Sequence, residues 1–256
     1  MKHITAMLVA AAFVSTVTAP AVAADRRKRT APAVTARVER TANVKGNVKR
    51  RVKRKLKASA VGAIANMPKG FVWPPNAAMQ AAGTACKAGL TDAAIDFTHA
   101  APHDRVPTPI ELTNLDIAGV RYVSIFRKPP FIMDCHLAAA LVQHSEKLYA
   151  LGVREVRFSR IYGYTNVRTG GKTKNMLSRH ALGMAMDIYS IVDDAGRVAV
   201  VGTDYKKADA LLLAVEQTLN ESHGFRTVLS PKNDPRSHHD HFHIEALVDF
   251  ATKPTT

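Results

Sequence analysis

The feature that most limits the fold is a break in charge and composition near residue 70. Residues 25–70 contain 15 lysines and arginines, two acids and no aromatic side chain. Such a segment cannot bury a core, so we expect it to be a basic arm that is disordered or transiently helical. Apart from Lys2, the rest of the chain carries 20 basic and 19 acidic residues. Residues 71–250 are therefore expected to form one near-neutral domain with a single core.

Residues 1–24 have the pattern of a secretory signal peptide. A short basic start at Lys2 and His3 precedes an apolar run, which ends in the small-x-small triplet Ala21-Val22-Ala23. An uncleaved anchor is the alternative, although Ser, Thr and Pro residues shorten the apolar run. We expect a periplasmic or secreted protein with no transmembrane segment after cleavage.

Export to an oxidising compartment bears on the two cysteines. Cys86 and Cys135 allow one intramolecular bridge, and we expect them to be bonded. Two buried thiols are the alternative. Behind a signal peptide, the basic arm 25–70 is expected to meet a membrane surface, lipopolysaccharide or cell-wall carboxylates, and no nucleic acid. A solvated spacer without a specific partner is the other interpretation of the arm.

Helical and strand patterns alternate along the domain without a regular βαβ order. This favours an α+β fold. Segments 76–90, 134–152 and 204–222 predict helices, the last capped by Thr203 or Asp204. Segments 109–115, 120–126, 154–162, 225–230 and 241–247 predict strands, and 184–202 predicts a hairpin.

A cluster of histidines in the stretch SHHDHFHIE (237–245) suggests metal chemistry. If this stretch is a strand, His239, His241 and His243 share one face, because side chains alternate. Neutral histidine is the commonest metal ligand. Short histidine runs also occur on ordinary surfaces, so the pattern alone is weak.

A second segment offers matching ligands. His180 precedes Asp187, which lies in an apolar run where an ionised carboxylate is costly unless it is paired or metal-bound. An Asp at a strand end, or an ordinary N-cap on a turn, is the plain alternative. Together, His180, Asp187 and one C-terminal histidine supply two nitrogens and an oxygen. Catalytic zinc sites keep three protein ligands and an open fourth position, where zinc lowers the pKa of water to about 7.

These residues resemble a known group of enzymes. The segment 178–187, SRHALGMAMD, is similar to the SxHxxGxAxD motif of zinc D-Ala-D-Ala peptidases and murein endopeptidases, and His241-x-His243 is similar to their second motif. More closely, the chain from about Cys86 to Ala246 resembles the extensin-like C-terminal domain family. The matching stretches are VPTPIELTNL, DCHLAAAL, SRHALGMAMDI, GFRTVLSP and HHDHFHIE.

The resemblance implies a fold and a metal site. The expected fold has a small antiparallel sheet flanked by helices, as in the hedgehog-like zinc D-Ala-D-Ala peptidases. The implied zinc ligands are His180, Asp187 and His243. His241 is implied to activate water or to stabilise the oxyanion. Asp240 holds the place of an acid in related dipeptidases, but alternation turns it away from the metal unless a bulge intervenes.

An arginine completes the implied site. Arg168 matches an arginine that precedes the first motif, and it would hold a substrate carboxylate or stabilise the tetrahedral intermediate. A solvated loop arginine is the alternative. Other members often carry a cysteine where this chain has Val167, which puts in doubt any bridge holding the Arg168 loop. His238 lies near a third family histidine, and His239 has no assignment.

The sequence therefore predicts an exported zinc peptidase that hydrolyses amide bonds in peptidoglycan peptides. One rival is a zinc-containing cell-wall binding module without catalysis. Another is an envelope-binding protein that acts through its basic arm 25–70. The scissile bond, the choice between endopeptidase and carboxypeptidase, and the oligomeric state do not follow from the sequence.

Overall fold

The computed structural model describes residues 66–251. The predicted signal peptide (1–24) and residues 25–65 of the basic arm lie outside the described residues. The described part contains four α-helices and two 3₁₀ turns: α2 (Ala77–Asp92), α3 (Cys135–Ala150), η1 (Arg179–Leu182), α4 (Val201–Asp204), η2 (Tyr205–Lys207) and α5 (Ala210–Asn220). None of the helices between residues 66 and 251 is long and apolar enough to cross a membrane.

The largest sheet is mixed. Its strand order is β11–β12–β9–β6–β4–β3, and β10 also pairs with β9. The strands are β3 (Asp116–Ile117), β4 (Val120–Ser124), β6 (Val153–Arg160), β9 (Ala185–Asp193), β10 (Val198–Val200), β11 (Phe225–Leu229) and β12 (Phe242–Ala246). The prediction of an antiparallel sheet is wrong for one pair, because β4 and β6 run parallel. Helix α3 lies between them in the sequence and returns the chain to the same end of the sheet.

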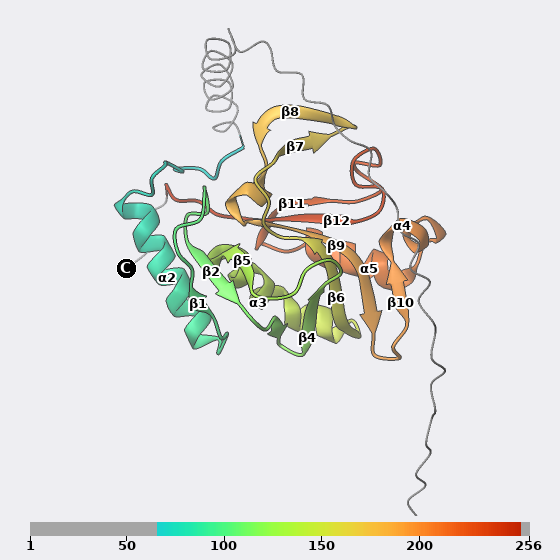
Figure 1. Ribbon diagram of the computed structural model, residues 1–256. Coiled ribbons are helices and arrows are strands. Elements are labelled where there is room, and N and C mark those ends of the chain that lie inside the picture. Colours follow the sequence, from blue (N-terminus) through green and yellow to red (C-terminus); the bar gives the residue numbers. More distant parts are fainter. Residues whose placement is uncertain (1–65, 252–256) are drawn as a thin grey trace, which may run out of the picture. The chain divides into compact units, whose positions relative to one another are not determined.

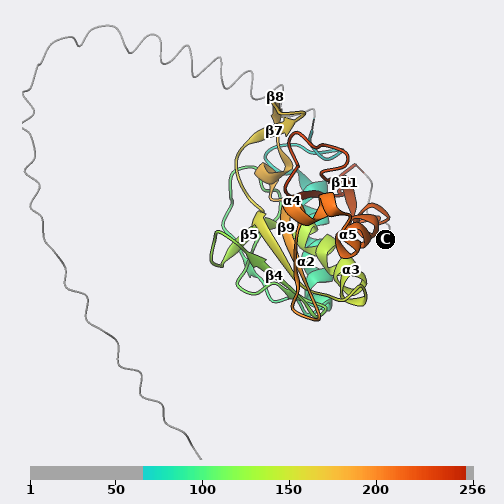
Figure 2. The same ribbon diagram turned by 90° about the vertical axis from the view of Figure 1, so that its right-hand side faces the viewer.

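Two smaller sheets complete the fold. One contains β1 (Thr98–His99), β2 (Pro109–Leu112) and β5 (Phe131–Asp134), and the other is the hairpin of β7 (Asn166–Thr169) and β8 (Lys172–Leu177). The hairpin stands at the top of the domain in both ribbon views (Figures 1 and 2). The α+β class is confirmed.

One face of the large sheet carries the core. Phe242 and Ile244 of β12 and Met186 and Ile188 of β9 are almost fully buried in the hydrophobic cluster. Helices α3 and α5 contact the sheet and each other, and Figure 2 shows them together on one side of β9. Alternation places the intervening residues of β9 and β12 on the opposite face, which is free to form a site.

The predicted helix over 204–222 is wrong in its extent. Helix α4, η2 and α5 replace it, because the chain turns at Ala208, where φ is +59°. The side chain of Asp209 then accepts a backbone hydrogen bond and starts α5. Asp209, rather than Thr203 or Asp204, therefore caps the long helix, as expected for a carboxylate directly before an apolar run.

The cysteines join two helices. Cys86 in α2 and Cys135 at the start of α3 form a disulfide with a Cα–Cα distance of 6.1 Å. The prediction of a bonded pair is confirmed.

Residues 66–70, which the sequence pattern assigned to the basic arm, contact the domain. Asn66 donates to the backbone of Leu177 at 3.2 Å. Lys69 forms an isolated β-bridge with Asp249, and its backbone carbonyl accepts a hydrogen bond from the amide of Phe250 at 2.8 Å. These contacts hold the start of the described chain against β8 and against residues 249 and 250.

Candidate metal centre

His180 is held on a short turn whose sequence explains its geometry. Ser178 precedes η1, and its hydroxyl accepts the amide hydrogen of His180 at 3.3 Å. Gly183 ends the turn with φ of +65°, and a Cβ added there would lie 2.7 Å from the amide nitrogen of Asp134. A glycine is therefore required for both conformation and space. Serine and glycine in the motif thus fix the ring that they flank.

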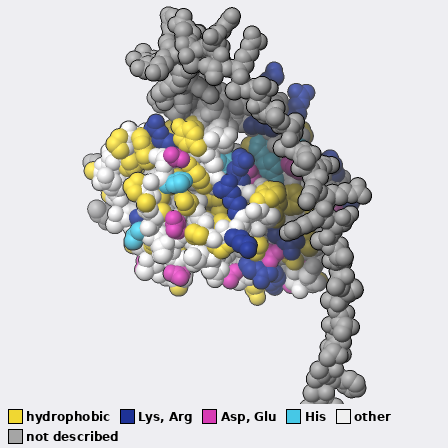
Figure 3. Space-filling view, viewed as in Figure 1, with side chains coloured by type: hydrophobic (Ala, Val, Ile, Leu, Met, Phe, Trp, Pro, Cys, Tyr) yellow, Lys and Arg dark blue, Asp and Glu magenta, His cyan; other side chains and the backbone are white. Residues whose placement is uncertain are grey.

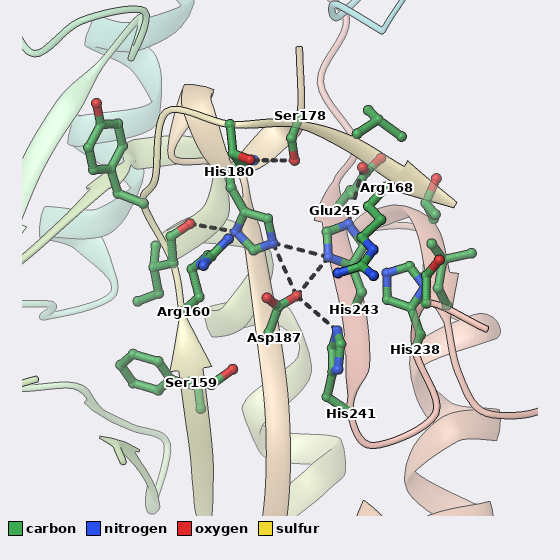
Figure 4. Close-up of a pocket in the computed structure, with 18 of the residues that line it drawn as sticks. Ser159, Arg160, Arg168, Ser178, His180, Asp187, His238, His241, His243 and Glu245 are labelled. Carbon is green, nitrogen blue, oxygen red and sulfur yellow. Dashed lines mark hydrogen bonds and ion pairs between the residues drawn. The ribbon is translucent and has the colours of Figure 1, made fainter. Parts of the chain in front are cut away.

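The other two candidate ligands are direct neighbours in the sheet. Strands β9 and β12 are antiparallel, and their register pairs Asp187 with His243. Cross-strand partners lie about 5 Å apart at Cβ, so their side chains meet on the face opposite the core. Figure 4 shows His180 reaching the same point from its turn.

The three side chains converge on one small volume. One donor atom each from His180, Asp187 and His243 can be chosen so that all lie within 4.8 Å of one another. Nε2 of His180 is 3.1 Å from Oδ1 of Asp187 and 3.2 Å from Nδ1 of His243. Nδ1 of His243 is 2.8 Å from the same carboxylate oxygen. Tetrahedral zinc with bonds of about 2.0–2.1 Å needs ligand atoms about 3.3 Å apart, so the triad could hold a metal ion with small adjustment.

The outward nitrogens of the two rings have fixed partners. Nδ1 of His180 lies 2.7 Å from the carbonyl oxygen of Ile161, and Nε2 of His243 lies 3.2 Å from a carboxylate oxygen of Glu245. Both partners are acceptors, so the outward nitrogens donate, and in the neutral rings the inward nitrogens carry the lone pairs. Two lone pairs and a carboxylate oxygen aimed at one point repel one another unless a cation lies between them. The cluster is therefore suited to binding a cation.

The pKa values of the cluster agree with this conclusion. Burial raises the pKa of Asp187, but the charges and hydrogen bonds of His180 and His243 outweigh it and hold that pKa well below its usual range. Burial lowers the pKa of His243, but its bonds to Asp187 and Glu245 raise it to about 9. A metal ion would take the place of the retained proton, since metal-binding histidine must be neutral.

Glu245 is a site residue that the sequence analysis missed. Its second oxygen accepts from Nε of Arg226 at 2.7 Å, and Arg226 in turn donates to the side-chain oxygen of Asn66 at 2.9 Å. Burial raises the pKa of Glu245, but the hydrogen bond and charge of His243 and the charges of Arg226 and Arg179 lower it to about 2. The signal in the sequence was its position two residues after His243, on the same strand face.

His241 lies beside the three candidate ligands. Its Nε2 is 3.6 Å from Oδ1 of Asp187, and its Nδ1 is 2.7 Å from Oδ1 of Asp240. Asp240 therefore orients the ring so that Nε2 faces the cluster. The expectation that His239 shares this face is wrong, because β12 begins only at Phe242 and the His239 side chain is 61% exposed.

His238 and the β7–β8 hairpin are connected through one carboxylate. Asp234 lies 3.0 Å from Nδ1 of His238 and accepts the hydroxyl of Thr169 at 3.0 Å. It also accepts the amide of Gly170 at 3.3 Å. The hairpin carries Arg168, which the sequence pattern placed in a loop. These bonds fix the Arg168 hairpin without the bridge that Val167 had put in doubt.

One open pocket of about 1080 Å³ is lined by the three candidate ligands and by their neighbours His238, His241 and Glu245. The exposed Arg168 is among its lining residues. In Figure 4, Arg160 and Arg168 lie on opposite sides of the His180–Asp187–His243 cluster. The pocket thus combines a possible metal site, a neighbouring imidazole and flanking guanidinium groups.

Comparison with protein-family models confirms the resemblance to the extensin-like C-terminal domain. A family model described as the extensin-like protein C-terminus matches residues 84–252. This match covers more than half of the 256 residues, and the chain belongs to that family. A search of curated proteins and a search of solved structures each found no match.

Proposed function

We propose that this protein is an exported, zinc-dependent peptidase that hydrolyses amide bonds in peptidoglycan peptides. The observation that carries the proposal is the convergence of His180, Asp187 and His243, with both rings fixed so that lone pairs point inward. The similarity of segment 178–187 to zinc D-Ala-D-Ala peptidases supports the reaction and a hedgehog-like fold. The signal-peptide pattern of residues 1–24 supports a periplasmic or secreted location.

Two nitrogens and one carboxylate oxygen suit zinc better than calcium or magnesium, which prefer oxygen ligands. When bound, zinc supplies Lewis acidity, which polarises an amide carbonyl and makes water a stronger nucleophile. The chain's contribution is to hold the rings of His180 and His243 in the orientation and tautomer that metal binding requires, through Ile161 and Glu245.

His241 is the proposed proton carrier. Because Nδ1 donates to Asp240, Nε2 carries the lone pair and faces the cluster. As water attacks the carbonyl carbon, Nε2 of His241 takes its proton. The same nitrogen then returns the proton to the amine nitrogen as the C–N bond breaks. Asp240 stabilises the imidazolium that forms in between.

Arg168 is the proposed electrostatic partner of the substrate. Its exposed side chain lines the pocket on a hairpin that Asp234 fixes in place. A guanidinium at this point stabilises the oxyanion of the tetrahedral intermediate or holds a substrate carboxylate.

The experiment that tests the proposal compares wild type with His241→Ala. Both are purified with zinc, and zinc content and release of peptides from purified peptidoglycan are measured. The proposal expects zinc in both proteins and a rate at least about 100-fold lower in the variant. A zinc-loaded wild type that releases no peptide would favour a non-catalytic cell-wall binding module instead.

A further inference from the structure

The pocket holds more positive charge than its acids can balance. Four lining cations have no carboxylate within ion-pair distance among residues 66–251: Arg127, Lys128, Arg160 and Arg168. The lining acids are Asp187, which faces the histidines, and Glu245, which pairs with Arg226. Figure 3 shows Lys and Arg side chains gathered beside the histidine-lined hollow. An uncompensated positive pocket favours an anionic ligand.

The cations flank the metal centre on two sides. Arg168 comes from the β7–β8 hairpin. Arg160 comes from β6, where the register pairs it with Asp187 of β9. Arg127 and Lys128 follow β4, whose last residue, Ser124, pairs with Phe158 of β6. The turn after β4 is thus two strand spacings from Asp187, or about 10 Å.

This turn is ordered at its base. The hydroxyl of Ser124 accepts the amides of Phe126 at 3.3 Å and Arg127 at 3.0 Å. The amide of Ile125 donates to the carbonyl of Phe158 at 2.9 Å. The two cations are therefore presented to the pocket from a fixed backbone, which reduces the entropy lost when they bind a ligand.

We infer that Arg127, Lys128 and Arg160 form an anion subsite that binds a carboxylate of the substrate. This inference rests on the proposed function and names the class of peptide that the site accepts. Arg160 lies on β6 between Asp187 and the turn that carries Arg127 and Lys128, and the span of about 10 Å from Asp187 to that turn corresponds to about three extended residues. The subsite therefore selects acidic peptides whose free carboxylate lies about three residues from the scissile amide, and it disfavours peptides in which that carboxylate is amidated.

The test uses two synthetic stem-type peptides with a carboxylate or a carboxamide three residues from the target amide. Their affinities for the zinc-loaded His241→Ala protein are measured by fluorescence anisotropy. The carboxylate peptide should bind about 10- to 100-fold more tightly, as is typical of a charge-assisted hydrogen bond. Arg127→Ala/Lys128→Ala, added to the same protein, should abolish that preference.

A matched control removes two exposed lysines outside the pocket, Lys147→Ala/Lys206→Ala. It should keep the preference, which separates the subsite from net charge. Equal affinity for both peptides, no binding of either, or the same loss in the control would overturn the inference. If wild type hydrolyses peptidoglycan but the carboxylate and carboxamide peptides bind equally well, only the subsite is refuted. If the carboxylate peptide binds more tightly but wild type hydrolyses no peptidoglycan, only the proposed function is refuted.

Discussion

The Glu245→Gln substitution tests whether metal affinity depends on the tautomer of His243. Glu245 accepts from Nε2 of His243 at 3.2 Å and from Arg226 at 2.7 Å, and its side chain is 8% exposed. In the variant, the amide oxygen would stay with Arg226, which only donates. The amide NH₂ would then face His243, favour an acceptor at Nε2 and move the ring proton to Nδ1, where the metal binds.

The expected cost is that of losing an outer carboxylate. Such partners change metal affinity by about 10- to 100-fold, which is about 1.4 to 2.7 kcal/mol. Competition against a chromophoric chelator at pH 7.5 measures the zinc affinity. Asp194→Asn is the control, because that side chain is 63% exposed and distant from the cluster in the sheet register.

Stability must be measured separately, because Glu245 also balances the charges of the buried Arg179 and the exposed Arg226. Thermal unfolding in the presence of EDTA reports this effect without metal. Zinc affinity within twofold of wild type, in a variant that unfolds normally, would refute the argument from the tautomer.

Three further predictions follow from the fold. Replacing Cys86 and Cys135 by serine should lower the free energy of unfolding by about 4 kcal/mol, because the bridge spans 49 residues, and urea unfolding of both forms checks this. Burial lowers the pKa of His144 in the folded protein. As the pH falls, this histidine therefore takes up a proton in the unfolded chain before it does so in the folded protein. Stability should fall as the pH drops below about 6.5, and His144→Gln should flatten that slope in unfolding measurements between about pH 5.5 and 7. Asp234→Ala should release the β7–β8 hairpin, which faster proteolysis at residues 166–177 would show and unchanged proteolysis would contradict.

The sequence predicted the parts of the site that depend on short-range patterns. Residue types and strand alternation indicated His180, Asp187 and one C-terminal histidine, and the resemblance to zinc D-Ala-D-Ala peptidases singled out His243, which the sheet places beside the other two. The hairpin formed by β9 and β10 was also predicted, because Asp193 to Gly196 carry turn residues between two strand-like runs.

The parts that were missed depend on distant contacts. The support behind His243 joins Glu245 and Arg226 to Asn66, which lies 160 residues from Arg226 in the sequence. No local pattern reports such a contact. The β7–β8 hairpin was within reach, since Gly170 and Gly171 stand at its turn, but its short exposed strands lack an apolar face.

The most direct test of the central claim is the metal content of the purified protein beside two histidine variants. His180→Ala removes a proposed ligand, and His239→Ala removes an exposed histidine outside the cluster. The account predicts about one zinc per chain in wild type and in His239→Ala, and a loss of zinc in His180→Ala. Wild type that binds no zinc after reconstitution, or His180→Ala that keeps it, would contradict the account.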